Sequence, residues 1–379
     1  MSGIGKKDTV RCALIGIGAQ GKKYAALLDG HEINGMALTA VCCRSGENAA
    51  WVREHLAPSV KVFRDEDKLY ENSDAFDAVL IATPHRQHPA MTIRALNHGK
   101  HVLCDKPAGI TASDATAMAE AARESGKKYG LICNQRAYEQ MRRIRSLLSE
   151  QAIGKLLRVT QISSRNFRTQ HYHRSSEWRS SWHGEGGGAL INQGYHLMDL
   201  WQFLFGMPET LYADIPFGKY NRFLVDDECT LVMRYADGLS GTFILTTGEG
   251  TTTERLEIVG TRGRILLEDN QIRLTLLNRD SAGYASEAVT NAREGLHATE
   301  HLESFGPQDR AYHAVLQNFA DAVLQDTQLI APGDDGVNTL RLINGAYLSA
   351  WQGKIIAMPP PDAVYQKMLQ EKEKAEESE

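Results

Sequence analysis

Six residues near the N-terminus have the types and spacing of a phosphate-binding loop. They are Gly16-Ile17-Gly18-Ala19-Gln20-Gly21, which fits G-x-G-x-x-G between an apolar, strand-like run and a helix-length segment. In such a loop the first glycine makes a tight turn, the second lets the backbone approach a pyrophosphate, and the third lets helix and strand pack closely. The helix N-terminus then offers free N–H groups and a positive dipole end. The loop predicts dinucleotide binding; the alternative is a simple structural turn.

The end of the second strand-like run bears on which dinucleotide is expected. In NAD-binding domains an Asp or Glu about 20 residues past the loop hydrogen-bonds the ribose hydroxyls. Here the run ALTAVCCRS places Cys43 roughly where that acid would be, followed by Arg44 and Ser45. No carboxylate would repel a 2′-phosphate, and Arg44 with Ser45 could bind one, so the sequence favours NADP over NAD. If Arg44 only caps the strand edge and stacks on adenine, either cofactor fits.

Two later strand ends also carry polar residues. They are residues 82–88 (ATPHRQH) and residues 104–107 (CDKP), and each follows an apolar run. In open parallel sheets ligands bind beyond the carboxyl ends of the strands, so both segments are expected to border the cofactor. A lysine beside an oxidised, cationic nicotinamide, and partly desolvated there, has a lowered pKa. Lys106 could then hydrogen-bond a reacting hydroxyl and take part in proton transfer. The alternative is a surface lysine paired with Asp105.

Further along, three polar residues fall on one face of an expected helix. Asn192, His196 and Asp199 are spaced i, i+4, i+7 after the glycine-rich run GEGGG. A polar stripe on an otherwise apolar helix needs hydrogen-bonding partners. These partners could be the groups of a bound ligand, which would make the helix part of a ligand pocket, or they could be neighbouring backbone groups.

The segment 166–185, NFRTQHYHRSSEWRSSWHGE, is long, polar and aromatic, as expected of a loop over a pocket. Trp178 and Trp182 could stack on the apolar face of a sugar ring, although tryptophans mostly pack in the core. Arg174 or Arg179 could bind a carboxylate or a phosphate.

Three ordered stretches of the chain resemble the Gfo/Idh/MocA family of nicotinamide-dependent sugar and polyol oxidoreductases. Residues 83–109, TPHRQHPAMTIRALNHGKHVLCDKPAG, resemble its T-P-x-x-x-H, G-K-H-V and [E/D]-K-P signatures. Residues 184–206, GEGGGALINQGYHLMDLWQFLFG, look like its glycine-rich substrate helix. Residues 333–356, GDDGVNTLRLINGAYLSAWQGKII, are similar to its closing helix. The resemblance covers nearly the whole chain and is more specific than the glycine loop alone.

This resemblance implies that Lys106, Asn192 and His196 carry the chemistry at a reacting carbinol. His196 would be the general acid/base, Lys106 would hold and polarise the substrate oxygen, and Asn192 would orient the substrate or the histidine. Polyol dehydrogenases of the family often have Asp in place of Asn192. A neutral Asn cannot raise the pKa of a base as an ionised partner does, so the division of labour between His196 and Lys106 stays open.

Two sets of contact residues follow. The residues expected at the substrate are Lys106, Trp178, Arg179, Trp182, Asn192, Tyr195 and His196. The residues expected at the dinucleotide are Gly16, Ile17, Gly18, Ala19, Gln20, Gly21, Arg44, Ser45, Ala82, Thr83, Pro84, His88, Asp105, Lys106 and Asn134.

The elements that must position these residues fall into two groups. From Val10 to Cys133, short and almost continuously apolar runs alternate with amphipathic helix-length segments, which is typical of a parallel sheet buried on both faces. From Thr210 to Leu277 the pattern alternates with a period near two, with turns at 236–238, at Gly248 and at 261–263.

We therefore expect an α/β protein of two domains. Residues 1–133 should form a Rossmann domain with a doubly wound parallel sheet. Residues 134–379 should form an α+β domain with a large, mainly antiparallel open sheet. Helices over 311–324 and 336–352 should close the fold. A charged tail over 362–379 should be solvated, either helical or disordered, without a direct chemical role.

Composition excludes several classes of protein. With 379 residues, 42% hydrophobic and 23% charged, the chain is typical of globular proteins. It has no apolar run near the roughly 20 residues of a membrane span and no signal core at the N-terminus, so a cytoplasmic location is expected. A net charge of −5 gives no basic field for nucleic acid. The six cysteines, without a C-x-x-C pair, should be buried hydrophobes in a reducing compartment. No metal is expected either, because the spacing of the histidines in 166–185 matches no firm zinc pattern.

Together these patterns predict an NAD(P)-dependent oxidoreductase. It would move a hydride between a nicotinamide and a secondary hydroxyl of a sugar, sugar acid, cyclitol or glycoside. The resemblance also implies a homodimer or homotetramer that associates through the second sheet, with no nucleic-acid or membrane partner. The alternatives are a redox-neutral glycoside-cleaving enzyme with tightly held NAD and a non-catalytic sugar or cofactor sensor. Retention of both Lys106 and His196 argues against the sensor.

Overall fold

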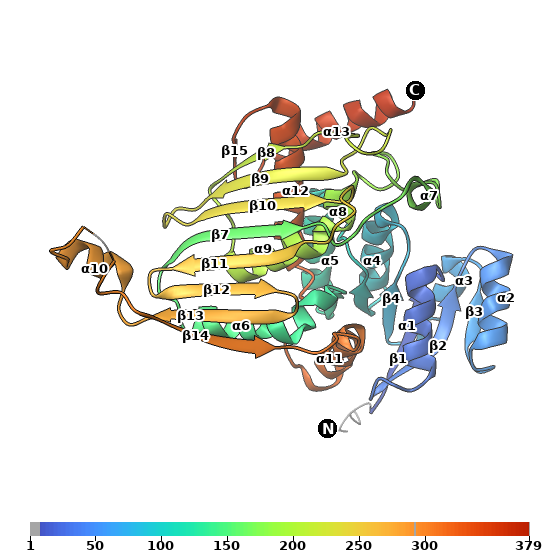
Figure 1. Ribbon diagram of the computed structural model, residues 1–379. Coiled ribbons are helices and arrows are strands. Elements are labelled where there is room, and N and C mark those ends of the chain that lie inside the picture. Colours follow the sequence, from blue (N-terminus) through green and yellow to red (C-terminus); the bar gives the residue numbers. More distant parts are fainter. Residues whose placement is uncertain (1–7, 292, 379) are drawn as a thin grey trace. The chain divides into compact units, whose positions relative to one another are not determined.

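The computed structural model describes residues 8–291 and 293–378 (Figure 1). The chain forms two compact units. The first unit comprises the chain up to Ala137 together with Asp309–Leu340, and the second comprises Tyr138–Gln308 together with the chain from Arg341 onward. The chain therefore leaves the first unit after Ala137 and returns to it at Asp309.

A six-stranded parallel sheet forms the centre of the first unit. Its order, β3-β2-β1-β4-β5-β6, is that of doubly wound dinucleotide-binding folds, with the strand order reversing beside β1. This confirms the fold class predicted for the N-terminal part. β3 is three residues long and was not predicted, because so short a run shows no period. The strands are β1 (Val10–Ile15), β2 (Met36–Cys42), β3 (Lys61–Phe63), β4 (Ala78–Ile81), β5 (His101–Cys104) and β6 (Tyr129–Leu131).

Local sequence signals set the helix ends of this unit. At the start of α5, the Thr111 side chain accepts from the Asp114 N–H and the Asp114 carboxylate accepts from the Thr111 N–H, which is a capping box. Ser45 and Asp65 cap α2 and α3 through their side-chain oxygens. The helices are α1 (Ala19–Asp29), α2 (Gly46–His55), α3 (Glu66–Glu71), α4 (His88–Asn97), α5 (Ala112–Ser125) and α11 (Ala311–Gln325).

A nine-stranded sheet forms the second unit, in the order β14-β13-β12-β11-β7-β10-β9-β8-β15. β7 and β10 are parallel and the other neighbours are antiparallel, which confirms a mainly antiparallel sheet. The strands are β7 (Leu156–Ser163), β8 (Thr210–Asp214), β9 (Glu228–Arg234), β10 (Ser240–Thr246), β11 (Glu254–Gly260), β12 (Gly263–Glu268), β13 (Gln271–Leu277), β14 (Ala298–Ser304) and β15 (Ile356–Ala357).

One face of this sheet packs on helices. Along β9, β10 and β11, buried residues alternate with half-exposed ones, as a sheet covered on one side requires. Figure 1 shows α6 and α9 behind the strands. The helices outside the first unit are α6 (Glu139–Ser149), α7 (Gln170–His173), α8 (Ala189–Asn192), α9 (Gly194–Phe205), α10 (Ser281–Glu287) and α13 (Asp362–Glu376), while α12 (Asp335–Gln352) runs from the first unit into the second.

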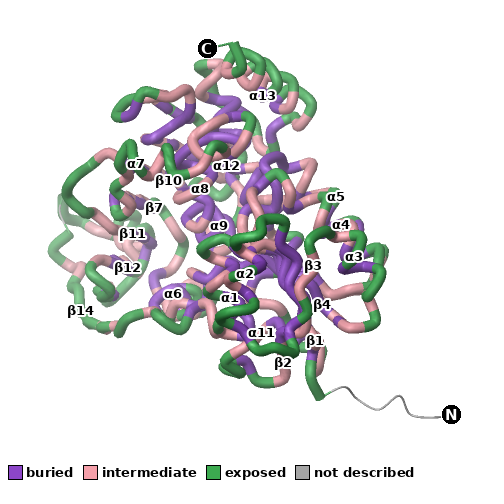
Figure 2. Tube along the Cα trace, turned by 90° about the vertical axis from the view of Figure 1, so that its right-hand side faces the viewer, coloured by how far each residue is buried: buried purple, intermediate pink, exposed green. Residues whose placement is uncertain are grey.

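The charged tail forms a docked helix rather than a merely solvated one. Figure 2 shows that α13 has an exposed outer side, but Tyr365 and Leu369 on its other side are buried. The carboxylate of Glu376 accepts hydrogen bonds from the backbone N–H groups of Trp182 and His183, both at 2.9 Å. The sequence could not show this anchoring, because the two partners lie 194 and 193 residues away.

The cysteines are buried, as expected. All six are free thiols, and desolvation raises the pKa of Cys12 to about 12. In the described ranges, no helix is both long enough and apolar enough to span a bilayer.

Candidate active site

The glycine loop makes the close contacts that its spacing predicts. Gly16 has φ +98°, and a Cβ there would lie 2.6 Å from the carbonyl oxygen of Ala82. A Cβ on Gly21 would lie 2.1 Å from the carbonyl oxygen of Gly16. On Gly18, by contrast, a Cβ would meet no described atom within 4 Å. The fold thus requires Gly16 and Gly21, whereas Gly18 leaves open the space through which a pyrophosphate would approach.

The helix that follows is suited to an anion. Gly18 is the N-cap residue of α1, no side chain caps the helix, and its first turn contains no acidic residue. The first N–H groups of a helix have no intrahelical acceptor and lie at the positive end of the dipole. Gly18 and Ala19 are exposed. These features fit the pyrophosphate of a dinucleotide.

Backbone hydrogen bonds bring the predicted loops to one edge of the parallel sheet. The N–H of Ala82 donates to the carbonyl of Ile15 at 2.8 Å, next to the glycine loop. The N–H of Asp105 donates to the carbonyl of Ile81, also at 2.8 Å. Segments 82–88 and 104–107 therefore lie beside the phosphate-binding loop within the first unit.

His88 ties the two segments together. Its buried imidazole lies 2.7 Å from the carbonyl oxygen of Thr83 and 2.7 Å from that of Pro107. Desolvation lowers the pKa of His88 by more than the carbonyl acceptors and the Asp105 carboxylate raise it. Both neighbours of the ring are carbonyl oxygens, which can only accept, so the imidazole is the hydrogen-bond donor that joins the two segments. His88, a predicted cofactor contact, is placed here to hold the loop of Lys106.

Asp105 is turned back into the protein. One carboxylate oxygen accepts from the Tyr24 hydroxyl at 3.1 Å, and the other accepts from the backbone N–H of Lys106 at 2.8 Å. Desolvation raises the pKa of Asp105, because burial penalises the charged form. Asp105 thus shapes the strand end at which the half-buried Lys106 lies.

Asn134 presents a buried amide oxygen near the end of β6. The residue is 5% exposed, and its Oδ1 has no hydrogen-bond partner among the described residues. Leaving such an acceptor unpaired is costly, so a donor from outside the chain is expected. The carboxamide N–H of a nicotinamide is a donor of the required kind.

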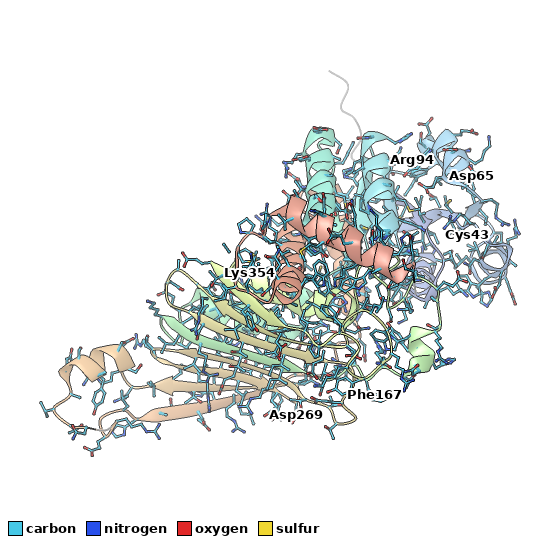
Figure 3. All side chains as sticks on the ribbon, turned by 90° about the horizontal axis from the view of Figure 1, so that it is seen from above. Cys43, Asp65, Arg94, Phe167, Asp269 and Lys354 are labelled. Atoms are coloured by element: carbon cyan, nitrogen blue, oxygen red, sulfur yellow. The ribbon has the colours of Figure 1, made fainter. Side chains whose placement is uncertain are left out.

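Two arginines meet where β2 and β3 end. The Arg64 guanidinium donates to the carbonyl of Arg44, and both residues are exposed. The Ser45 hydroxyl accepts from the Asn48 N–H at 3.1 Å and so starts α2. Cys43, labelled in Figure 3, is buried beside them. Sequence reasoning missed Arg64, because it follows the strand that was too short to recognise.

In the second unit, Asn192 and His196 share a face although the predicted helix is divided. Gln193 separates α8 from α9, but its φ of −74° and ψ of −42° keep the chain helical. Asn192 and His196 are half-buried, whereas Asp199 is 1% exposed. The two residues predicted to be catalytic are therefore the more accessible part of the stripe.

Asn192 hydrogen-bonds a buried carboxylate that sequence reasoning missed. Its Nδ2 donates to Glu185, which is 2% exposed and also accepts from the Ser180 N–H at 2.7 Å. Nδ2 also lies 3.3 Å from the Tyr172 hydroxyl. Glu185 thus places a carboxyl group one side chain behind Asn192. Its signal in the sequence is the single acid within GEGGG.

A second buried carboxylate fixes the start of α8. Asp226 accepts from the N–H of Gly188 at 2.8 Å, from the N–H of Leu190 at 2.6 Å and from the Tyr347 hydroxyl at 2.7 Å. Desolvation raises the pKa of Asp226. These bonds satisfy helix-terminal donors that would otherwise be buried without acceptors, so Asp226 positions the helices that carry the polar stripe.

Two of the predicted substrate contacts lie in the core. Trp182 is 1% exposed, and its ring meets Phe217 and Trp351 edge-on while its indole N–H donates to the Leu224 carbonyl at 3.1 Å. Tyr195 is 0% exposed. An aromatic ring packed in this way is a core element rather than a platform for a sugar.

The rest of the segment is more open. It begins beside Phe167, labelled in Figure 3, which is 53% exposed. Trp178 and Arg179 are half-buried, with the guanidinium 4.7 Å from the centroid of the indole ring. Arg174 is exposed and donates to the side chain of Gln170 at 3.2 Å. Of the two arginines predicted to bind an anion, Arg179 is thus the one near Asn192 and its neighbours.

Across residues 8–291 and 293–378, no group of three or more His, Cys, Asp or Glu side chains is placed to hold a metal ion.

The first unit, with its strand order and glycine loop, defines the class of dinucleotide-binding α/β proteins. Two family models make the assignment specific. "Oxidoreductase family, NAD-binding Rossmann fold" matches residues 10–132, and "Oxidoreductase family, C-terminal alpha/beta domain" matches residues 145–358. The chain belongs to the Gfo/Idh/MocA oxidoreductase family, as the sequence motifs predicted.

Individual relatives are distant. Trans-1,2-dihydrobenzene-1,2-diol dehydrogenase of Bos taurus is 27% identical over 235 residues, which are 61% of this chain and 66% of that protein. scyllo-Inositol 2-dehydrogenase (NADP(+)) of Bacillus subtilis (strain 168) is 26% identical over 230 residues, 60% of each chain. The matches thus span less than two thirds of these relatives. The WlbA dehydrogenase of Bordetella pertussis, solved with NADH and UDP-GlcNAcA, has a TM-score of 0.77 at 21% identity and covers 93% of this chain and 100% of its own. That likeness establishes the fold.

Proposed function

We propose that the protein is an NAD(P)-dependent dehydrogenase or reductase acting on a secondary hydroxyl of a sugar, sugar acid, cyclitol or glycoside. The observation that carries this proposal is the position of Lys106, at the edge of the parallel sheet that also holds the glycine loop and segment 82–88. Family membership and the names of the two relatives, dehydrogenases of a dihydrodiol and of an inositol, support it.

The roles of the residues follow from their chemistry. When bound, the nicotinamide supplies or accepts the hydride. Lys106 holds the substrate oxygen and stabilises the negative charge that grows on it. His196 takes or returns the hydroxyl proton, because imidazole exchanges protons readily near neutral pH. Asn192 orients the substrate or the histidine.

Glu185 accounts for the neutral residue at position 192. A carboxylate can bond only the NH2 end of an amide, so Glu185 fixes the rotation of the Asn192 side chain. The carboxyl group that a family Asp would have at this position lies one side chain further back here, at Glu185. On this proposal Glu185 and Asn192 together replace that Asp, with His196 as the acid/base.

The cofactor is proposed to be NADP rather than NAD. Arg44 and Arg64 give the end of β2 two positive charges, and no carboxylate stands in the position that would repel a 2′-phosphate. Replacing both arginines by Gln should raise the KM for NADP by about 10-fold, at about 1.5 kcal/mol for a lost charge-assisted bond, and leave the KM for NAD nearly unchanged. An equal change for both cofactors would contradict the preference.

A homo-oligomer is proposed through the face of the second sheet that helices leave uncovered. This face mixes half-exposed apolar and polar side chains, as protein interfaces do. Light scattering should give a dimer or a tetramer, and a monomer would contradict this part of the proposal. The residues include Tyr212, Val232, Ile244, Ile162, Thr242 and Arg158.

A cofactor-reduction screen tests the function directly. Sugars, uronates, inositols and glycosides are offered with NAD and with NADP, and formation of reduced nicotinamide is followed by its absorbance. The proposal expects reduction with at least one class of substrate. Cleavage of a glycoside without accumulation of reduced cofactor would instead indicate redox-neutral chemistry, and binding without turnover would indicate a sensor.

A further inference from the structure

We propose that the substrate carries an oxyanion, either a carboxylate or a phosphate, which Arg168 and Arg179 bind beside Tyr172. The inference rests on the proposed function, because it names the class of substrate that the same enzyme takes. Arg179 is one of the two arginines that the sequence predicts for an anion; Arg168 has no such mark in the sequence.

Two positive charges converge on one aromatic side chain. The guanidinium carbon of Arg168 lies 4.2 Å from the centroid of the Tyr172 ring, and that of Arg179 lies 4.7 Å from it. Both arginines are half-buried. Desolvation is the main cause that lowers the pKa of the neighbouring His173; the charge of Asp227 opposes it, and the charges of Arg168 and Arg179 lower the pKa further. Two guanidinium groups thus share one aromatic ring.

Neither arginine is neutralised by an acidic side chain of the described chain. Other arginines of this unit form ion pairs, such as Arg143 with Glu303 and Arg158 with Glu257, but no ion pair of Arg168 or Arg179 occurs within 4.0 Å in the described ranges. The Nε atoms of both are buried without a hydrogen-bond partner among those residues.

The nearby carboxylates are engaged elsewhere. Glu185 bonds the Ser180 N–H and Asn192. Asp227 accepts three backbone N–H groups of the segment 219–221, at 2.8 to 3.2 Å. These bonds direct the two acids toward other partners, and neither acid forms an ion pair with the two guanidinium groups among the described residues.

Donors also outnumber acceptors at the Tyr172 hydroxyl. Nitrogen donors of Arg179, Gln193 and Asn192 lie 2.8, 3.2 and 3.3 Å from its oxygen. A phenolic oxygen cannot accept well from three N–H groups at once. An oxyanion supplies several further acceptors, and the planar fork of a guanidinium matches a carboxylate or phosphate in shape.

The place of the cluster ties it to the reaction. Tyr172 contacts Asn192, which is assigned to the reacting carbinol, so an anion held here would sit a few bonds from the oxidised carbon. A sugar acid or a sugar phosphate carries an anionic group close to a secondary hydroxyl. A neutral polyol has no anionic group to pair with the two guanidinium groups.

Matched substrates and variants test the inference. Glucuronate is compared with glucose, and glucose 6-phosphate with glucose, using wild-type enzyme, Arg168→Gln, Arg179→Gln and the control Arg174→Gln from the same segment. We expect wild type to prefer an anionic substrate, and each of the first two variants to raise its KM by about 10- to 100-fold, as loss of a charged hydrogen bond does. The KM for the cofactor should not change. The better of the two anions identifies the oxyanion.

Several results would overturn the inference. They are equal use of neutral and anionic substrates, a change in cofactor KM in place of substrate KM, and an equal effect of Arg174→Gln. Arg179→Lys, which keeps the charge, should recover part of the lost affinity, and thermal melting shows whether each variant folds. If no compound reduces the cofactor, the proposed function fails. The inference is then decided separately, by calorimetric binding of glucuronate and glucose 6-phosphate to wild type and to Arg168→Gln. Absence of binding of both anions to wild type overturns the inference.

Discussion

The two units hold their functional residues by different means. In the first unit the main chain does most of the positioning: glycines allow close approach, strand ends are joined by backbone bonds, and His88 bridges two carbonyl groups. In the second unit two buried carboxylates, Glu185 and Asp226, hold the helix segments and the side chain at position 192. Positioning by the main chain requires small residues at close contacts, whereas positioning by a carboxylate requires its oxygen atoms as hydrogen-bond acceptors. Different substitutions should therefore disable each unit.

The largest effect is expected at Lys106 and His196, the residues proposed to react with the substrate. Lys106→Ala and His196→Ala should each lower kcat by about 10²- to 10⁴-fold, because a positioned proton-transfer group contributes about that much. Steady-state kinetics measure the loss, and cofactor binding followed by fluorescence shows that the first unit is intact. Lys127→Ala, in the same unit as Lys106, serves as the control and should be nearly wild type. Near-normal turnover of Lys106→Ala would contradict the role assigned to Lys106.

Two glycines of the loop are expected to serve different purposes: Gly21 is needed for folding, and Gly18 is needed for cofactor binding. A methyl group on Gly21 collides with backbone, so Gly21→Ala should destabilise the protein by about 1 to 3 kcal/mol, as overpacking does, and weaken cofactor binding. A methyl group on Gly18 meets open space, so Gly18→Ala should keep its melting temperature yet lose cofactor affinity. Unchanged affinity in Gly18→Ala would show that the pyrophosphate does not approach there.

Carboxylate positioning in the second unit is tested at Asp226. In Asp226→Asn one acceptor oxygen becomes an NH2 group, which leaves a buried N–H of α8 unpaired; the expected loss is about 1 to 3 kcal/mol in the free energy of unfolding. Tyr347→Phe removes a single hydroxyl donor and should cost less, about 0.5 to 1.5 kcal/mol. Urea unfolding compares the two. The reverse order of effects would mean that Asp226 is not the anchor of α8.

The smallest effect concerns the pH dependence of stability. The pKa of His88 is lower in the native protein than its ordinary value of 6.5, so the unfolded chain takes up a proton first on acidification. The contribution of His88 is thus complete above about pH 6.5 and is lost as the pH falls toward its native pKa. Unfolding measured from about pH 8 to about pH 5 should show a shallower acid loss in His88→Gln than in wild type. An unchanged slope would mean that His88 has the same pKa in the native protein and in the unfolded chain.

The same contrast explains what the sequence could predict. Apart from β3, the strands of the first unit follow from local patterns, as do the glycine loop and Lys106. These features depend on residues that are adjacent in the sequence. No local sequence pattern predicts the roles of Glu185 and Asp226. Asp226 accepts hydrogen bonds from backbone groups 36 and 38 residues away, and a lone acidic residue in a sequence does not show which groups it will accept from. Arg64 and Arg168 could not be predicted for a related reason: each contacts its partners only after folding brings separate segments together.

The docked end of the chain has a practical consequence. Because Glu376 accepts from the backbone N–H groups of Trp182 and His183, removal of the last helical turn would take away two of the bonds that hold the segment carrying Arg179, while the parallel sheet belongs to the other unit. A shortened chain could then bind nucleotide normally and still handle its substrate poorly. Chains shortened before residue 376 are therefore expected to be poor material for substrate screening, even when they are stable in purification.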